Sequence, residues 1–308
     1  YSDDLADGDV LPVRYFARDL VLFRTHDGQA HLCSAYCPHL GAHLGHGGKV
    51  TDTGIACPFH GWEFNTRGEV ASIPYASRVP AKAHDKRCLT VYPVHEQNNF
   101  IFAWYHPDNI APLFELEPFE ELDSGDWADC EIRQWTIHTH IQESGENGVD
   151  TAHFPTVHNT GDMMSRVEVT FDGHKRISII PVSHQRVDSD GPIAEKDTDT
   201  VDGTMRSANI GPGQSWTRNY GIDILMIGLP TPVEADVMEL RFACSVPKKN
   251  ASANADITRL IYDNAFEQIE QDIPIWENKI YQPDPILCDG DGPIARYRRW
   301  FQQFYSRQ

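Results

Sequence analysis

Short runs of apolar residues separated by turn residues dominate the first third of the chain and predict β-strands. Strand-sized runs at 20–24 and 30–33 flank the segment Thr25-His26-Asp27-Gly28, and Asp-Gly between apolar runs is a strong hairpin signal. Residues 41–54 are rich in Gly, His and Thr, a composition that favours an irregular loop. A buried strand is expected at 99–104.

A change of composition at residues 112–127, which are rich in Pro, Glu and Asp, predicts a surface crossing between two domains, 1–111 and 112–308. Beyond it we expect a strand over 131–140 and a helix starting near Gln142. Two further runs, 166–171 and 176–180, flank Asp172-Gly173 and predict a second hairpin. The alternation at 238–242 predicts another strand.

The last part of the chain reads as helix. Between Thr258 and Ile280 the apolar residues recur at three- and four-residue steps, which is typical of a long amphipathic helix. A shorter helix is expected from Ile294 to Tyr305. Strands followed by a long C-terminal helix suggest an α+β fold with an antiparallel sheet wrapped around that helix.

Charge and cysteine content narrow the function classes. The 308 residues include 26 Lys and Arg against 45 Asp and Glu, a net charge of −19, which argues against a nucleic-acid backbone or an anionic membrane surface as the main partner. The longest apolar run, 224–227, is far too short to span a membrane. Seven cysteines are an odd number and favour metal ligation in a reducing cytoplasm. The chain opens on Tyr1, so targeting is left open.

The first candidate metal site combines Cys37-Pro38-His39 with Cys57-Pro58-Phe59-His60, after seventeen intervening residues. Two thiolates and two imidazoles on loops can converge on one metal centre, and both a structural zinc and an iron–sulfur cluster accept this donor set. No zinc-finger helix pattern follows these residues, which favours the cluster. Cys33, His43 and His46 lie nearby, but four ligands are already present without them.

The second candidate site lies between Asn147 and His158. Asp150 and His153 are three residues apart and would share a helix face, whereas His153 and His158 are five apart, about 140° around an ideal helix. Pro155 disfavours a helix before it, so the helix should deform or end there and let both imidazoles turn toward one ion.

Two histidines need a carboxylate to complete the facial triad of a non-haem Fe(II) oxygenase. Candidates on the C-terminal helix are Glu267, Glu270, Asp272 and Glu277. Taken alone, two histidines at this spacing are a short motif with a high false-positive risk.

With its C-x-H and C-x-x-H pair, the chain resembles the Rieske iron–sulfur proteins. The resemblance implies a 2Fe–2S cluster in which Cys37 and Cys57 hold one iron and His39 and His60 the other. The segment Asn147-x-x-Asp150-x-Ala152-His153-Phe154-x-x-x-His158 and the segment Gln271-Asp272-Ile273-Pro274-Ile275-Trp276 extend it to the α subunits of Rieske oxygenases. The second of these segments resembles the one that carries the aspartate ligand in that family, and the resemblance therefore implies Asp272 as the third iron ligand.

The final stretch, 283–305, is similar to the oxygenase components of 3-ketosteroid 9α-hydroxylases, near which the cholesterol 7-desaturases also lie. That resemblance implies an all-β Rieske domain followed by a catalytic domain of the helix-grip, START-like type. It also implies hydroxylation of an apolar, steroid-like substrate with O2, and an NAD(P)H-dependent reductase that carries flavin and its own iron–sulfur cluster.

The same family architecture implies a homotrimer in which the cluster of one subunit serves the iron of its neighbour. Asp150 would bridge the two centres, and Asn147 would approach the iron. Apolar residues such as Met226, Leu229 and Phe242 are candidates for the substrate pocket. The alternatives are a Rieske oxygenase that desaturates, demethylates or dihydroxylates another hydrophobic substrate, and a Rieske electron carrier without catalysis.

Overall fold

The computed structural model describes residues 1–84, 86–159, 167–185, 187–188, 191–192 and 200–306. The chain divides into two compact units, Tyr1–Pro118 and Phe119–Gln308, where the sequence suggested a division after residue 111. No helix among the described residues has both the length and the apolar character needed to cross a membrane.

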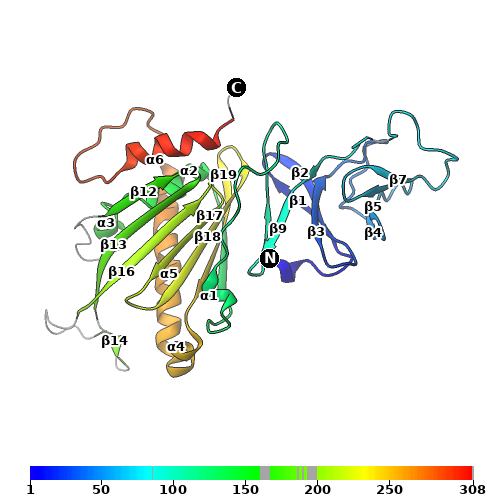
Figure 1. Ribbon diagram of the computed structural model, residues 1–308. Helices are drawn as coiled ribbons and strands as arrows, with labels where there is room; N and C mark the ends of the chain where they lie inside the picture. The colour runs from blue at the N-terminus through cyan, green and yellow to red at the C-terminus, as the bar shows by residue number, and fades with distance from the viewer. Residues whose placement is uncertain (85, 160–166, 186, 189–190, 193–199, 307–308) are drawn as a thin grey trace. The chain divides into compact units, whose positions relative to one another are not determined.

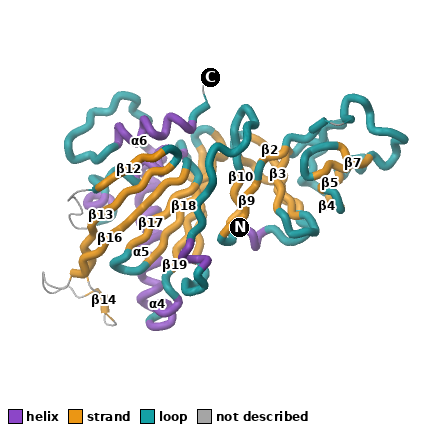
Figure 2. Tube along the Cα trace, viewed as in Figure 1, coloured by secondary structure: helices purple, strands orange, loops and turns teal. Residues whose placement is uncertain are grey.

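Unit 1 is built almost entirely of short antiparallel strands (Figures 1 and 2). Its sheets are β1 (Val10–Tyr15), β2 (Arg18–Arg24), β3 (Ala30–Ser34) and β8 (Val91–Tyr92); β4 (Lys49–Thr51), β5 (Gly54–Ala56), β6 (Glu63–Asn65) and β7 (Val70–Ser72); and β9 (Val94–Gln97) with β10 (Phe100–Ala103). The hairpin expected around Asp27-Gly28 is β2–β3, and the strand expected at 99–104 is β10. The loop expected over 41–54 is interrupted, because β4 begins within it.

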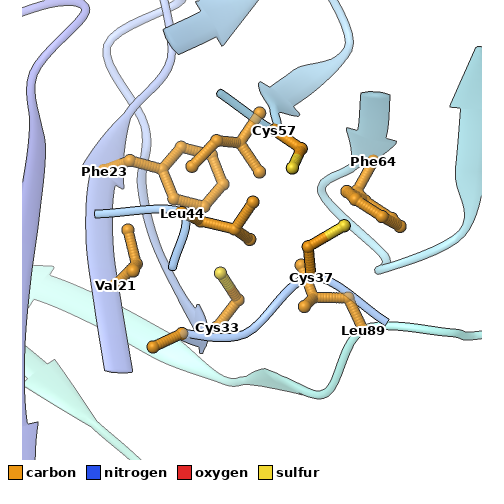
Figure 3. Close-up of a cluster of buried hydrophobic side chains, with 10 residues drawn as sticks. Val21, Phe23, Cys33, Cys37, Leu44, Cys57, Phe64 and Leu89 are labelled. Carbon is orange, nitrogen blue, oxygen red and sulfur yellow. The ribbon is translucent and has the colours of Figure 1, made fainter. Parts of the chain in front are cut away.

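The core of unit 1 lies between these short strands and the two loops of the first metal motif. Val21, Phe23 and Phe64 are almost fully buried there. Cys37 and Cys57 pack into the same cluster, as Figure 3 shows. The loops that carry the motif are therefore anchored by the hydrophobic core rather than free at the surface.

Unit 2 holds a seven-stranded, fully antiparallel sheet in the order β11-β19-β18-β17-β16-β13-β12. The strands are β11 (Glu131–Ile137), β12 (Glu168–Asp172), β13 (Lys175–Gln185), β16 (Thr200–Ile210), β17 (Gln214–Asn219), β18 (Ile224–Glu234) and β19 (Val237–Ser245), with a separate pair β14 (Val187–Asp188) and β15 (Gly191–Pro192). The second expected hairpin is β12–β13; residue 166, its expected first position, lies outside the described residues.

The long helix α5 (Ala255–Asn278) crosses one face of this sheet (Figure 1). It starts where the Asn254 side chain accepts a hydrogen bond from the Ile257 N–H at 3.0 Å, a typical N-cap. Its apolar stripe buries Phe266 and Trp276 against residues of β11 and β19. An antiparallel sheet around a long C-terminal helix is the architecture expected from the sequence.

The other helices of unit 2 are shorter: α1 (Glu120–Asp123), α2 (Ile141–Asn147), α3 (Phe154–Val157), α4 (Lys248–Ala253) and α6 (Ile294–Phe301). Helix α6 continues into a 3₁₀ turn (Gln302–Phe304), so the helical region expected over 294–305 is present in two parts. Tyr297, Trp300 and Phe301 of α6 pack with Val149, just beyond α2. This contact holds the segment that leads into the second metal motif.

Candidate metal centres

The two loops of the first motif have the same backbone geometry. In each, the cysteine N–H donates to the carbonyl of the residue five positions on, at 2.8 Å for both Cys37 and Cys57. The glycine four positions on, Gly41 or Gly61, donates back to the cysteine carbonyl. Both glycines have positive φ, 78° and 68°, a conformation that costs a side-chain-bearing residue energy. Each cysteine thus lies at the base of an equivalent tight turn.

The four side chains of this motif separate into a sulfur pair and an imidazole pair. Cys37 and Cys57 are buried, and their thiols are in hydrogen-bond contact. Burial, reinforced by the neighbouring Cys57 thiol, raises the pKa of Cys37. The rings of His39 and His60 lie 4.8 Å apart between centroids. This division fits a two-iron cluster with both thiolates on one iron and both imidazoles on the other.

Aromatic and apolar side chains surround the imidazole pair. Trp62 stacks on His39 with 4.6 Å between ring centroids, and its indole N–H donates to the Tyr75 hydroxyl at 2.8 Å. Leu40 and Phe59, next to the two histidines in the chain, are 66% and 63% exposed. The neighbours of the two histidines in the chain are therefore exposed at the surface of unit 1.

The nearby cysteine and histidines take other roles. Cys33 is a core residue of β3 with no exposed surface. The rings of His43 and His46 lie 4.5 Å apart, and His43 Nδ1 accepts a hydrogen bond from the Gly45 N–H. All three therefore have contacts of their own in unit 1.

The second motif has a different local structure from the one expected. Helix α2 ends at Asn147, and α3 begins only at Phe154, so Asp150 and His153 do not share a helix face. Pro155 does not end a helix; it lies in the first turn of α3, where its missing N–H costs nothing. His153 and His158 flank this four-residue helix as its N-cap and C-cap. Their rings lie 5.1 Å apart at 76°.

Asp272 of α5 completes the group. Its Oδ1 lies 3.5 Å from His158 Nε2 and 3.9 Å from His153 Nε2. One ligand atom from each of the three residues lies within 4.8 Å of the others. A group this compact, found among the described residues, could hold a metal ion. Asp272 is only 6% exposed, and burial raises its pKa. Two imidazoles and one carboxylate form the donor set of a facial triad.

The other acidic residues considered on α5 point elsewhere. Glu270 forms an ion pair with Arg133 at 3.3 Å. Glu277 accepts the His138 backbone N–H at 3.1 Å, and Glu267 accepts from the Gln271 side chain at 3.4 Å. Of the four candidates, only Asp272 reaches both histidines.

Gln271, which sequence reasoning did not single out, orients one of the histidines. Its Oε1 lies 2.9 Å from His158 Nδ1. An amide oxygen can only accept, so Nδ1 carries the hydrogen and Nε2 is left to face Asp272. The only sequence signal was its position next to Asp272. Its contact depends on how α3 and α5 meet in the fold.

The surroundings of His153 differ. Its Nδ1 is buried and makes no hydrogen bond among the described residues. The nearest carboxylate oxygen, Asp150 Oδ2, is 3.9 Å away, too far for a direct hydrogen bond. The other Asp150 oxygen accepts the Ala152 N–H at 3.1 Å. The Asp150 carboxylate is therefore near His153 without a direct hydrogen bond to its ring.

Asn147 does approach the second site. Its Oδ1 accepts the Trp276 indole N–H at 3.3 Å, and its side chain also hydrogen-bonds to Asp272. The amide thus joins the end of α2 to two positions on α5, one helical turn apart. It contacts the carboxylate whose Oδ1 lies nearest the two histidines.

A cavity lies between α2, α5 and the sheet, and two of its lining residues, Ile269 and Trp276, are on α5 on either side of Asp272. Its apolar lining includes Trp216, Leu240, Phe242, Ile269 and Trp276, and its polar lining includes Ser207 and Asn209. Phe242 was expected there. Met226 packs instead in the core cluster under α5, and Leu229, although buried, is not among the lining residues. Sequence reasoning missed the contribution of β16 and β17.

Comparisons with known proteins agree with both halves of this description. Residues 1–93 match the Rieske [2Fe-2S] domain, and residues 103–305 match the 3-ketosteroid 9α-hydroxylase C-terminal domain. The chain is 33% identical to a 3-ketosteroid-9-alpha-monooxygenase oxygenase component from Rhodococcus rhodochrous, over 99% of this chain and 81% of that protein. It is 30% identical to a cholesterol 7-desaturase from Xenopus laevis, over 98% of this chain and 69% of the relative.

The fold is similar to that of solved structures of lower identity. A crystal structure of dicamba monooxygenase bound to dicamba superposes with a TM-score of 0.75 at 17% identity, covering 98% of this chain and 94% of that one.

Proposed function

The chain belongs to the 3-ketosteroid 9α-hydroxylase family of Rieske oxygenases, and from this premise we propose that it hydroxylates an apolar polycyclic substrate of the 3-ketosteroid type. It is a Rieske non-haem iron monooxygenase that uses O2 and electrons from a separate reductase. The observation that carries the proposal is the group formed by His153, His158 and Asp272, together with a partly apolar cavity that reaches α5 on either side of Asp272.

We propose that these three residues hold the mononuclear iron, and that Cys37, His39, Cys57 and His60 hold the cluster. The donor chemistry supports this assignment: two neutral imidazoles and one carboxylate suit Fe(II), and two thiolates with two imidazoles suit the cluster. When bound, the two groups together supply single electrons and activate O2, so that one oxygen atom enters the substrate and the other leaves as water.

The residues around the iron ligands set their orientation. Gln271 fixes the His158 ring so that Nε2 faces the metal position. Asn147 holds the Asp272 carboxylate through a hydrogen bond that favours its charged form. Loss of a neighbour of this kind typically costs about 10- to 100-fold in metal affinity or activity.

The cavity supports an apolar substrate. Phe242, Leu240 and Ile269 form an apolar wall, and Trp276 lies one helical turn beyond Asp272 on α5. A rigid hydrocarbon ring system buries its surface well in such a space and excludes water from the reacting position.

The assembly and the electron donor are part of the same proposal. The electron donor is a reductase with flavin and its own iron–sulfur cluster, fed by NAD(P)H. The chain assembles as a homotrimer, and Asp150 connects the cluster of one subunit to the iron of the next. In support, Asp150 is part-exposed beside His153, whose Nδ1 is buried and without a hydrogen bond in the described structure.

Desaturation of a sterol is the second candidate, and it is favoured by the similarity to cholesterol 7-desaturases from Xenopus laevis, at 30% identity, and Caenorhabditis elegans, at 29%. The two reactions use the same metals and differ in the fate of oxygen. A hydroxylase retains one oxygen atom in the product, whereas a desaturase releases both.

The test combines metal analysis with product analysis. Anaerobically purified protein should contain about three irons and two sulfides per chain, with a rhombic Rieske signal by electron paramagnetic resonance after dithionite reduction. Turnover of androst-4-ene-3,17-dione under ¹⁸O2 with a ferredoxin reductase should give a product carrying one labelled oxygen. An unlabelled product with a new double bond would favour desaturation, and zinc in place of iron would exclude both.

A further inference from the structure

A buried arginine is among the residues that line the cavity. Arg176 of β13 is 2% exposed, the largest side chain that is fully buried in the described structure. It is also the one charged residue among those that line the cavity. A guanidinium removed from water is costly unless its charge is compensated.

The partners of Arg176 are all neutral. Its Nε donates to Asn209 Oδ1 at 2.9 Å, and Nη2 donates to the same oxygen. Its Nη1 has the Ser178 hydroxyl at 2.7 Å, the Ser207 hydroxyl at 2.9 Å and the Gly148 carbonyl at 3.0 Å as acceptors. No carboxylate of the described residues forms an ion pair with it. The nearby acids of α2 are engaged elsewhere: Glu146 pairs with Arg298 and Glu143 with Lys279.

The sheet register builds this polar corner. In the β13–β16 pair Arg176 lies opposite Asn209, and Ser178 lies opposite Ser207. All four side chains project from one face of the two strands, because positions two apart share a face. Asn209, Ser178 and Ser207 are themselves nearly fully buried. The corner is therefore shielded from bulk solvent and held by its own hydrogen bonds before any ligand enters.

Burial lowers the pKa of Arg176 to about 10, and the neighbouring Tyr297 opposes this only partly. The guanidinium is still charged at neutral pH. Folding has already removed the guanidinium from water. An anion that binds it therefore gains a charge-assisted hydrogen bond, and the free-energy cost of desolvating the cation is not added to the cost of binding.

We propose that the cavity binds a substrate with an acidic group, and that Arg176, Ser207 and Asn209 receive its carboxylate while the apolar rings lie against Phe242 and Trp276. The inference rests on the proposed function and names its substrate class more closely: a polycyclic hydrocarbon skeleton with a carboxylate at one end. A site that offered only hydrogen-bond donors would also bind a ketone. A buried cation without a counter-ion favours an anion instead.

The test compares two ligands of the same shape on the iron-loaded wild-type protein, by calorimetric titration without O2 at neutral pH. The probes are 3-oxo-4-androstene-17β-carboxylic acid, ionised under these conditions, and its primary amide. We expect the acid to bind roughly tenfold tighter or more, because a charge-assisted hydrogen bond is about twice as strong as a neutral one. Equal affinities would overturn the proposal.

Asn209→Asp is the decisive variant. It has nearly the shape of the native side chain but places a carboxylate on the Arg176 guanidinium, so the preference for the acid over the amide should disappear. Ser207→Asp supplies the same internal counter-ion from the same strand face if the first variant does not fold. Asn254→Asp, at the N-cap of α5 and away from the cavity, is the matched control and should keep the preference.

The remaining outcomes are equally informative. If the acid is still preferred with a carboxylate at residue 209 or 207, Arg176 is not the receptor of the anion and the proposal fails. If neither probe binds, the cavity assignment and the steroid class of the proposed function both fail. The iron content and the resonance signal test the metal centres separately, so that result would leave the oxygenase assignment standing.

Discussion

At the scale of single residues, the proposed iron site depends on side chains that hold other side chains. His158 and Asp272 each have a neighbour that fixes their orientation, Gln271 and Asn147 respectively. His153 has none within the described chain. The spacing of the histidines and the choice of Asp272 could be read from the sequence and its resemblance. Gln271 and Arg176 could not, because their importance arises from contacts between distant segments.

Replacing Asp272 by asparagine should remove the mononuclear iron and leave the cluster in place. The amide keeps the size of the side chain but removes the charge that Fe(II) prefers, so we expect iron to fall from about three to about two per chain with the Rieske signal unchanged. Asp256→Asn, the same change in the exposed first turn of α5, should keep all the iron. Full iron occupancy in the Asp272 variant would rule out this carboxylate as a ligand.

Gln271→Leu tests whether the orientation of His158 matters. Loss of the acceptor for Nδ1–H frees the ring and its tautomer, and we expect the affinity for Fe(II) to fall roughly 10- to 100-fold. Competition with a chelator measures this directly. Gln268→Leu, one turn earlier on α5 and bonded only to Asn264 in the described structure, is the control. Equal iron retention in both variants would contradict the role given to Gln271.

Asp150→Asn addresses the path between the centres. Both metal sites should stay occupied, because Asp150 belongs to neither ligand set. Reoxidation of the reduced cluster in a single turnover should slow by about tenfold or more, since a carboxylate near an imidazole controls its orientation and basicity. Stopped-flow absorbance follows this step, with the exposed Asp172→Asn as control. An unchanged rate would exclude the bridging role.

At the scale of elements, the strongest sequence patterns predicted the structure best. The amphipathic stripe predicted over 258–280 corresponds to α5 within a few residues, and both Asp-Gly hairpins are present. The segment between α2 and α3 was misjudged because local spacing suggested one continuous helix. In the fold that segment is a turn, fixed by packing of Val149 against α6 and by the hydrogen bond between Asn147 and Trp276.

The contact between α2 and α6 makes a stability prediction. Arg298 of α6 forms a two-bond ion pair with Glu146 of α2, at 2.7 and 2.8 Å, and Glu146 is 6% exposed. Arg298→Met leaves that carboxylate buried and unpaired. We therefore expect the free energy of unfolding, measured by urea denaturation, to fall by about 3 kcal/mol. The double variant Glu146→Gln/Arg298→Met should recover most of the loss. If the double variant stays as unstable as Arg298→Met, the lost packing of the Arg298 side chain between the helices, and not the unpaired charge, causes the destabilisation.

At the scale of the whole molecule, two units with separate cores carry separate metal motifs. Composition indicated this division, because a segment rich in Pro and acidic residues separates the cluster motif from the iron motif. Which cluster serves which iron is not a property of one chain's sequence. It depends on assembly, and the proposed trimer gives an answer that a mixing experiment can test.

Co-expression of Cys57→Ser, which lacks the cluster, with Asp272→Ala, which lacks the iron, supplies that test. Electron transfer inside one subunit would leave every mixed assembly inactive, because no chain holds both centres. Transfer to a neighbour restores activity wherever an intact cluster adjoins an intact iron. With random mixing in a cyclic trimer, half of the subunits hold an intact iron site, and half of those have a neighbour with an intact cluster. Activity should therefore reach about one quarter of that of wild type. Each variant expressed alone should be inactive, and a mixed sample as inactive as either parent would refute transfer between subunits.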